Sequence, residues 1–299
     1  MARAEPVQLS ERVYYLPGGV NCALVIGDDA RAVVVDSGQD KEYGRALRKA
    51  CEALAVTPAA IVNTHSHADH FGGNAYLLRQ FPEARVYAPP FEASIIRAPY
   101  LEPVYLFHGA RPPRELLSKW LQAEASPVHQ EIEEGPLSLC GVDFEALDTS
   151  GHAHRQLALR VDDVLLAADA FFGDGVLEKY ALPFGQDIGK QRAAFEVVGR
   201  SGVRVAVPGH GDPSEDLGAS VRANRAAVDR AAEAVEAACA GVGTEAVLAG
   251  VCEVLGVAIQ DLPRYHLNLC TVSAYLSYLR ESGRVSARLT GGRLTWHAA

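Results

Sequence analysis

Short runs of apolar residues alternate with amphipathic stretches through residues 1–90. Turn residues such as Pro17-Gly18-Gly19 bound the β-rich runs, which predicts strands. After Asp40, a residue type that caps helix N-termini, apolar positions recur at helical spacing, which predicts a helix. The elements expected in this part are strands at 13–16, 22–26, 32–35, 59–63 and 86–88, helices at 40–54 and 74–81, and a loop at 64–73.

A second set of strands and helices begins at residue 137, after a segment of different character. Residues 90–135 are rich in proline and aromatic residues and show no regular strand pattern, so we interpret them as a helical, loop-rich insertion. The elements expected after the insertion are strands at 141–147, 157–161, 164–168 and 203–207, and helices at 187–199 and 213–239. The order echoes the first half and leaves an internal duplication open.

The end of the chain has the order helix, helix, hairpin. The expected elements are helices at 244–255 and 270–281 and strands at 286–289 and 293–296, which flank Gly291-Gly292. This order is typical of a winged-helix-like arrangement. We therefore divide the chain into a main domain, 1–235, which includes the insertion, and a small C-terminal region, 236–299.

Composition excludes several classes of protein. The 299 residues are 48% hydrophobic and 22% charged, with a mean hydropathy of +0.01, as in globular proteins and unlike disordered ones. No apolar run is long enough to span a membrane, and the first residues lack the apolar core of an export signal. The six cysteines form no Cys-x-x-Cys pair, so we expect reduced thiols in a cytoplasmic protein.

The charge distribution argues against nucleic acid as a partner. A formal net charge of −9 repels phosphate backbones. The tail is locally basic, and its charged residues are Arg280, Glu281, Arg284, Arg288 and Arg293. The helix expected at 271–281 carries only Arg280 as a base, whereas a DNA-binding regulator needs a basic recognition helix. We therefore interpret the tail as a packing or dimerisation appendage, and a homodimer stays open.

One segment carries most of the candidate chemistry. Directly after an apolar strand, residues 63–73 run Asn-Thr-His-Ser-His-Ala-Asp-His-Phe-Gly-Gly. Strand alternation places His65 and His67 on the same side of the backbone, and neutral imidazole is a preferred ligand of zinc-class ions. Asp69 and His70 follow where the loop turns and can face a second position nearby. So many ligand-type residues in one loop predict a metal site.

Further ligand-type residues follow other predicted strands. His152 follows the strand that ends at 147, Asp169 directly follows the strand 164–168, and His210 follows the strand 203–207. Each is weak evidence alone, but together they are strong, because strands deliver loop-borne residues to one rim of a sheet sandwich.

These motifs together resemble the metallo-β-lactamase-fold hydrolases. The similarity extends over roughly residues 10–215 and includes the segments 64–70, 151–152 and 208–211, with Asp169 and Asp36. It implies an α/β fold, a four-layer αβ/βα sandwich with metals at one edge, an insertion and a small C-terminal subdomain. By this resemblance His65, His67 and His152 bind a first metal, Asp69, His70 and His210 bind a second, Asp169 bridges both and Asp36 supports them from behind.

The resemblance also implies the chemistry. Two divalent ions, zinc by default with iron or manganese as alternatives, would share a hydroxide at neutral pH and stabilise an oxyanion. Asp69 would be catalytic, because it would orient the hydroxide and pass a proton to the leaving group. The expected substrate is a small thioester, ester or lactone, as in the glyoxalase-II-like and lactonase-like branches, and the sequence does not choose between them.

Other activities of the same fold stay open. A nuclease for single-stranded RNA or DNA is favoured by the basic tail and opposed by the net charge. A mononuclear-iron thiol or persulfide oxygenase stays open, because such enzymes can keep a similar motif. The di-iron oxygen-reducing members of the fold are disfavoured, because their motif resembles His-x-Glu-x-Asp, whereas His67 stands at the second position here, which favours hydrolysis. β-Lactam hydrolysis is opposed by the missing export signal.

Candidate substrate contacts lie beside the metal motifs. His154 either contacts substrate or is a solvated loop histidine, and Arg155 suits a substrate carboxylate. Tyr180 belongs to the segment 177–184, which we expect to border the site. The insertion is expected to cover the substrate, and its aromatic residues either line an acyl pocket or pack the insertion onto the domain: Tyr100, Tyr105, Phe107 and Trp120.

Overall fold

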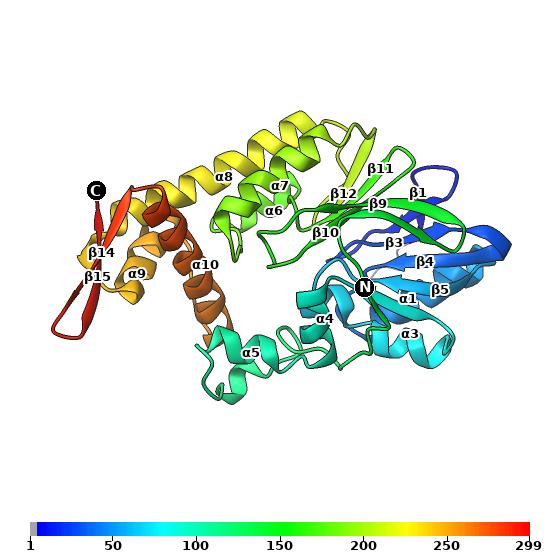
Figure 1. Cartoon of the computed structure of the whole chain (residues 1–299), viewed down its shortest axis with the longest axis horizontal. Coiled ribbons are helices and arrows are strands. Elements are labelled where there is room, and N and C mark those ends of the chain that lie inside the picture. The colour runs from blue at the N-terminus through cyan, green and yellow to red at the C-terminus, as the bar shows by residue number, and fades with distance from the viewer. Residues whose placement is uncertain (1–4) are drawn as a thin grey trace.

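The computed structural model describes residues 5–299 (Figure 1). The first four residues, part of the segment in which no export signal is expected, lie outside the described residues. Two β-sheets form the centre, helices cover their outer faces, and the C-terminal elements lie beyond one end of the sandwich (Figure 1). The predicted α/β sandwich with a C-terminal helical part is confirmed.

The first sheet has seven strands in chain order, from β1 to β7. Strands β1 to β4 are antiparallel to their neighbours, and β4 to β7 are parallel. The strands are β1 Val7–Gln8, β2 Val13–Leu16, β3 Cys22–Ile26, β4 Arg31–Val35, β5 Thr57–Val62, β6 Arg85–Ala88 and β7 Gln130–Glu131. Strand β7 lies within the predicted insertion, where the sequence indicates no strand, because two residues are too short to show an alternation.

The second sheet has five strands in the order β12-β11-β10-β9-β8, and only β11 and β12 are parallel. The strands are β8 Gly135–Leu139, β9 Val142–Asp148, β10 Leu157–Val161, β11 Val164–Ala168 and β12 Val205–Pro208. Side chains such as Val33 from the first sheet and Leu159 from the second form the apolar core between the sheets.

Helices cover both outer faces of the sandwich, so the layers are helix, sheet, sheet, helix (Figure 1). The helices of this part are α1 Lys41–Ala53, α2 Ala68–Phe71, α3 Asn74–Gln80, α4 Pro90–Arg97, α5 Leu101–Leu106, α6 Asp174–Lys179, α7 Ile188–Arg200 and α8 Leu217–Ala238, with short 3₁₀ turns η1 Asp28–Ala30 and η2 Arg114–Leu116. Asp40 caps α1 and Asp187 caps α7, each by accepting from a backbone N–H of the first turn. Helices α2 and α6 are too short for a periodic pattern to predict them.

The C-terminal region contains α9 Thr244–Leu255 and α10 Leu262–Glu281, with a sheet of β13 Ala240–Val242, β15 Arg293–Ala298 and β14 Val285–Thr290. Helix α10 begins well before the predicted residue 270, because Asp261 caps it and Pro263 suits its first turn. Helix α8 ends at Ala238, so the predicted boundary between 235 and 236 lies in its last turn. One apolar cluster joins α7, α8, α9 and α10, which fastens the region to the sandwich.

None of the helices within residues 5–299 has the combination of length and hydropathy that a membrane crossing requires.

Candidate metal centre

The predicted metal ligands meet at one edge of the sandwich, where β5, β9, β11 and β12 end. Their ligand atoms form three overlapping groups, and within each group all atoms lie within 4.8 Å of one another. The groups are His65, His67 and His152; His65, His70 and Asp169; and Asp69, His70 and His210. Residues that are up to 145 positions apart in the chain thus converge as their strand ends do.

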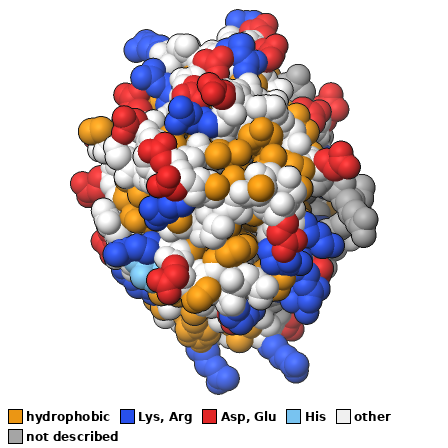
Figure 2. Space-filling model, turned by 90° about the vertical axis from the view of Figure 1, so that its right-hand side faces the viewer, with side chains coloured by type: hydrophobic (Ala, Val, Ile, Leu, Met, Phe, Trp, Pro, Cys, Tyr) orange, Lys and Arg blue, Asp and Glu red, His pale blue; other side chains and the backbone are white. Residues whose placement is uncertain are grey.

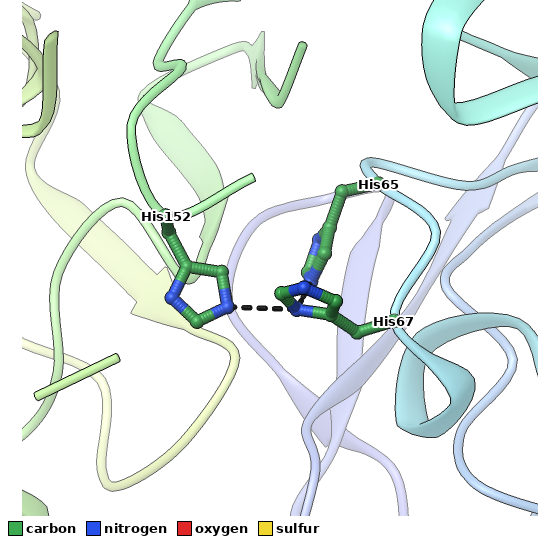
Figure 3. A group of neighbouring side chains, drawn as sticks. All are labelled: His65, His67 and His152. Atoms are coloured by element: carbon green, nitrogen blue, oxygen red, sulfur yellow. Dashed lines mark hydrogen bonds between the residues drawn. The ribbon is translucent and has the colours of Figure 1, made fainter. Parts of the chain in front are cut away.

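The first group fits a metal ion better than it fits hydrogen bonds (Figure 3). Nδ1 of His67 lies 3.1 Å from Nε2 of His65 and 2.9 Å from Nε2 of His152. Three ring nitrogens that face one another cannot all be satisfied by protons, since neutral imidazole has one donor and one acceptor. A single cation accepts all three lone pairs. Among the described residues, Nε2 of His70 and Oδ1 of Asp169 are also buried with no hydrogen bond, which suits atoms that would bind a cation.

In His152 and His210, the ring nitrogen that points away from the site faces a backbone carbonyl oxygen. Nδ1 of His152 faces the carbonyl of Phe184 at 3.2 Å, and Nδ1 of His210 faces the carbonyl of Gly19 at 2.6 Å. A carbonyl accepts only, so each Nδ1 carries a proton, and Nε2 is the ring nitrogen that would bind a cation.

Asp36 holds the motif loop from behind. Its carboxylate accepts from the backbone N–H and the hydroxyl of Thr64, both at 2.8 Å, and lies 2.8 Å from Nδ1 of His70. Its backbone is left-handed, with φ 54°, a strain of the kind stored at functional sites. Asp36 therefore contacts both the motif loop and the ring of His70, and its role as a support of the metal centre stays a prediction.

Asp169 lies between the histidines of the different groups. Its Oδ2 is 3.1 Å from Nε2 of His152 and 3.5 Å from Nε2 of His210, and its Oδ1 is 3.4 Å from Nε2 of His70. The preceding Ala168 has φ 46°, which turns the carboxylate off the end of β11. Asp169 thus lies between the two groups of candidate ligands, and its bridging role stays a prediction.

Protonation in the metal-free protein differs between the histidines. Burial lowers the pKa of His67 to about 4 and that of His152 to about 3, so both are neutral at pH 7 and ready to bind a cation. Burial also opposes the charge of His70, but the carboxylates of Asp169 and Asp36 outweigh it and raise its pKa to about 10. Binding a cation at His70 therefore requires the loss of a proton.

Two positioning residues are not found by sequence reasoning. Glu92 of α4 is 1% exposed and accepts from the backbone N–H of Ser66 and of Arg155, both at 3.0 Å, and from the Ser66 hydroxyl. It ties the loop of His65 and His67 to the loop of His152. Asn21 donates through its side chain to the carbonyls of Pro208 and Gly211, at 2.9 and 2.7 Å, and so holds the His210 loop. A lone Glu in a helix and a lone Asn in a turn carry no pattern that reveals these contacts.

Phe184 forms an aromatic wall of the site. Its ring lies edge-on to His67 and His152, with centroids 5.3 and 5.4 Å away. The segment 177–184 thus borders the site, as expected, but through Phe184 and its carbonyl.

The predicted substrate contacts lie farther out. The side chain of Tyr180 is 54% exposed and is covered on one side by Lys179. His154 is exposed and packs on the ring of Phe91 at 5.0 Å, and the exposed Arg155 is 3.9 Å from Glu133. The assignment of these three residues as substrate contacts stays a prediction.

The aromatic residues of the insertion divide into two kinds. Tyr100 and Trp120 are exposed, whereas Tyr105 and Phe107 pack with Leu267 of α10. Packing onto the C-terminal helix thus accounts for the second pair.

Residues 15–210 match the metallo-beta-lactamase superfamily, and the chain belongs to that superfamily. The motif-based prediction of a metal-dependent enzyme of this class is confirmed.

Curated relatives and solved structures show different parts of the similarity. The chain is 30% identical over 151 residues to the hydroxyacylglutathione hydrolase of Xylella fastidiosa (strain M12), and 28% identical over 151 residues to that of Xanthomonas campestris. Each alignment covers 50% of this chain and 45% or 46% of the relative, so the chain spans about half the length of the curated relatives it matches.

Two solved structures match nearly the whole chain. A metallo-beta-lactamase family protein from Thermus thermophilus has a TM-score of 0.74 at 21% identity, covering 98% of this chain and 100% of that one. A beta-lactamase domain protein from Burkholderia ambifaria has a TM-score of 0.74 at 18% identity, covering 100% and 94%. These likenesses concern the fold, and they include the C-terminal region.

A bound divalent ion is expected to stabilise the fold measurably, and Zn²⁺ is the ion to test first. A ligand present at about 100 times its Kd that binds only the folded state adds about 2.7 kcal/mol to the free energy of unfolding, which raises the Tm of a chain this size by about 4 °C. Thermal denaturation of chelator-treated protein with and without Zn²⁺ tests this. His152→Ala is expected to lose much of the gain, whereas the exposed His154→Ala is expected to keep it. An equal gain in His152→Ala and wild type would contradict the ligand assignment.

Proposed function

We propose that this protein is a binuclear metal-dependent hydrolase, with zinc as the most fitting metal, that cleaves a small thioester, ester or lactone. The observation that carries the proposal is the pair of three-residue groups at His67 and His210 with the Asp169 carboxylate between them. His65, His67 and His152 would hold one ion, and Asp69, His70 and His210 the other. Bound there, such ions would polarise a substrate carbonyl as Lewis acids and would lower the pKa of bound water to about 7.

The residues of the chain contribute orientation and proton transfer. The side chain of Asp69 is 28% exposed, unlike the buried Asp169, and its Oδ2 is 3.4 Å from Nε2 of His210. It therefore stands where a substrate reaches the site, and it is the carboxylate placed to orient an attacking water and carry its proton to the leaving group. The ring of Phe184 excludes water beside His67 and His152.

Thioesters are the first substrates to test, because the curated relatives are hydroxyacylglutathione hydrolases and an acyl-glutathione is a thioester. Nucleic acid is a weaker candidate. Helix α10 is packed between the α7–α9 cluster and the insertion, so its residues Leu267 and Leu269 are not free to enter a groove. On the face in Figure 2, acidic and basic side chains are interspersed rather than gathered into a basic surface.

The proposal includes a small-molecule substrate and no membrane partner. It also includes a cytoplasmic location, which suits the six cysteines, since none of them forms a disulfide within residues 5–299. The homodimer is a separate question that sedimentation of the purified chain answers.

A hydrolysis panel on zinc-loaded protein tests the function. It compares acyl-glutathione thioesters, homoserine lactones, a chromogenic β-lactam and short single-stranded RNA. We expect turnover of one small-molecule class, with a loss of about 100-fold or more in His152→Ala. Turnover of RNA alone would instead indicate a nuclease. Turnover of nothing, with oxygen consumed in the presence of thiols and iron, would indicate an oxygenase.

A further inference from the structure

The last two strands form a β-ribbon with one apolar face and one polar face. Strands β14 and β15 pair in register from Val285 and Ala298 to Thr290 and Arg293. Because side chains alternate along a strand, this register puts the apolar residues of the ribbon on one side and the polar ones on the other. The apolar face consists of Val285, Ala287, Leu289, Leu294, Trp296 and Ala298, and the polar face of Ser286, Arg288, Thr290, Arg293, Thr295 and His297.

The apolar face of the ribbon runs from the core of the C-terminal region out into solvent. At its base, Val285 is 3% exposed, and Trp296 packs against the apolar cluster of α8, α9 and α10. At the ribbon tip, residues 288–294, Leu289 is 74% exposed and its cross-strand partner Leu294 is 44% exposed. Strand β14 is an edge strand, and the tip lies at the end of the molecule opposite the two-sheet sandwich (Figure 1). An apolar face that continues beyond the core along an open edge suits a protein partner.

A second exposed surface of the same region has matching chemistry. Val254, in the last turn of α9, is 66% exposed, and Leu262, the first residue of α10, is 42% exposed. These two residues flank the connection between the helices. Each is preceded in the chain by an exposed acid, Glu253 and Asp261. We call these four residues the acidic corner, since apolar side chains stand there beside carboxylates.

The charges of the ribbon tip and the acidic corner are opposite. Within residues 5–299, Arg288 and Arg293 of the tip form no ion pair, whereas Arg284 at the base pairs with Glu236. In the corner, Asp261 lies 3.6 Å from Arg264, and Glu253 forms no ion pair within the described part of the chain. The ribbon contributes +3 to a net charge of −9, so the remainder of the chain carries −12. Opposite charges beside apolar residues favour association and fix its orientation.

We propose that the ribbon tip binds the acidic corner of a second copy of this chain. Each copy carries both surfaces, so a two-fold axis lets each tip bind the corner of its partner, and the assembly closes as a dimer. Leu289 and Leu294 pack on the apolar residues of the corner. Arg288 has a side chain long enough to reach round the edge strand to Glu253.

The sizes of the two surfaces set the strength of the association. Each contact is small, so the dimer is weak and depends on protein concentration, unlike a permanent dimer with an extensive apolar interface. Nucleic acid is a weaker occupant, because the net charge of the chain repels phosphates. The association requires no activity of the metal centre.

Sedimentation velocity of the full chain over a range of protein concentrations tests the proposal. We expect wild type to pass from monomer to dimer as concentration rises, and Leu289→Gln to weaken association about tenfold or more at an unchanged Tm. Leu117→Gln is the matched control, since this leucine of the insertion is 41% exposed and should not affect association. A wild type that stays monomeric at every concentration overturns the proposal, as does a dimer that Leu289→Gln leaves intact.

An exchange of charges identifies the partner surface. Arg288→Glu and Glu253→Arg should each weaken association about threefold or more, because every dimer contains the changed contact twice. The double variant restores the attraction with reversed signs and should associate better than either single variant. A double variant that associates no better shows that the acidic corner is not the partner surface and overturns the proposal. A monomeric chain that binds single-stranded RNA, and loses it in Arg288→Glu, assigns the tip to nucleic acid and also overturns it.

Discussion

Replacing Gly209 by alanine is expected to remove metal and activity from the site. A Cβ on Gly209 would overlap with Oδ1 of Asp169, and it would lie 2.8 Å from Cε1 of His70. The backbone cannot move away, because the carbonyl of Gly209 accepts from the N–H of Asn21 at 2.7 Å and its N–H donates to Ala168 at 2.6 Å. Two ligands must therefore shift, which we expect to lower metal affinity and turnover by about 100-fold or more.

Metal content after dialysis and kcat/KM on the best substrate of the panel measure this effect. Gly199→Ala is the matched control, since its Cβ meets only Cγ2 of Val221, at 3.6 Å, and alanine favours the helix. We expect overpacking in Gly209→Ala to cost about 1–3 kcal/mol of unfolding free energy, which leaves the protein folded. A Gly209→Ala protein with full metal content and normal turnover would show that Asp169 is not held as described.

Replacing Glu92 by glutamine is expected to loosen both metal-binding loops. Glutamine has one acceptor oxygen, whereas Glu92 uses both of its oxygens, one for Ser66 and the other for the N–H of Arg155. The new NH₂ group must therefore face one backbone N–H, donor against donor, in a site that is 1% exposed. We expect a loss of about 1–3 kcal/mol in unfolding free energy and about 10–100-fold in metal affinity.

Zinc titration and chemical denaturation of the same variant measure the two quantities. The control is Glu124→Gln, where the glutamate is exposed and its pair with Arg79 lies at the surface, so little change is expected. If Glu92→Gln loses stability but binds zinc as tightly as wild type, Glu92 holds α4 and not the metal loops.

Much of the fold is readable from local patterns. Strands 157–161 and 164–168 and the helix 244–255 agree with the structure residue for residue, because each is a strong apolar pattern between turn residues or capping signals. The hairpin around Gly291-Gly292 is also where the sequence places it. The two-residue strand β7 and the short helices α2 and α6 cannot be predicted in this way, since they form through pairing and packing with distant segments.

The candidate metal ligands are the part of the site that the sequence specifies. His65, His67, Asp69 and His70 stand in one loop, and the remaining ligands stand at strand ends, so ligand chemistry and strand order together bring them to one rim. Each of these ligand-type residues can be recognised from its immediate sequence context, as a member of the motif loop or as a residue that follows a strand.

The residues that hold and surround the metal centre depend on the folded chain. Glu92 meets Ser66, Asn21 meets Gly211, and Tyr105 meets Gln186 across separations from 26 to 190 residues. No sequence pattern marks these residues, because each acts through a hydrogen-bond partner that lies far away in the chain. The same holds for α10: the sequence places it in a winged-helix-like order, and only the folded chain shows that it packs against the insertion and the outer helices. Packing of distant apolar faces excludes water from these contacts, and only then do their hydrogen bonds and charges become strong enough to shape the site.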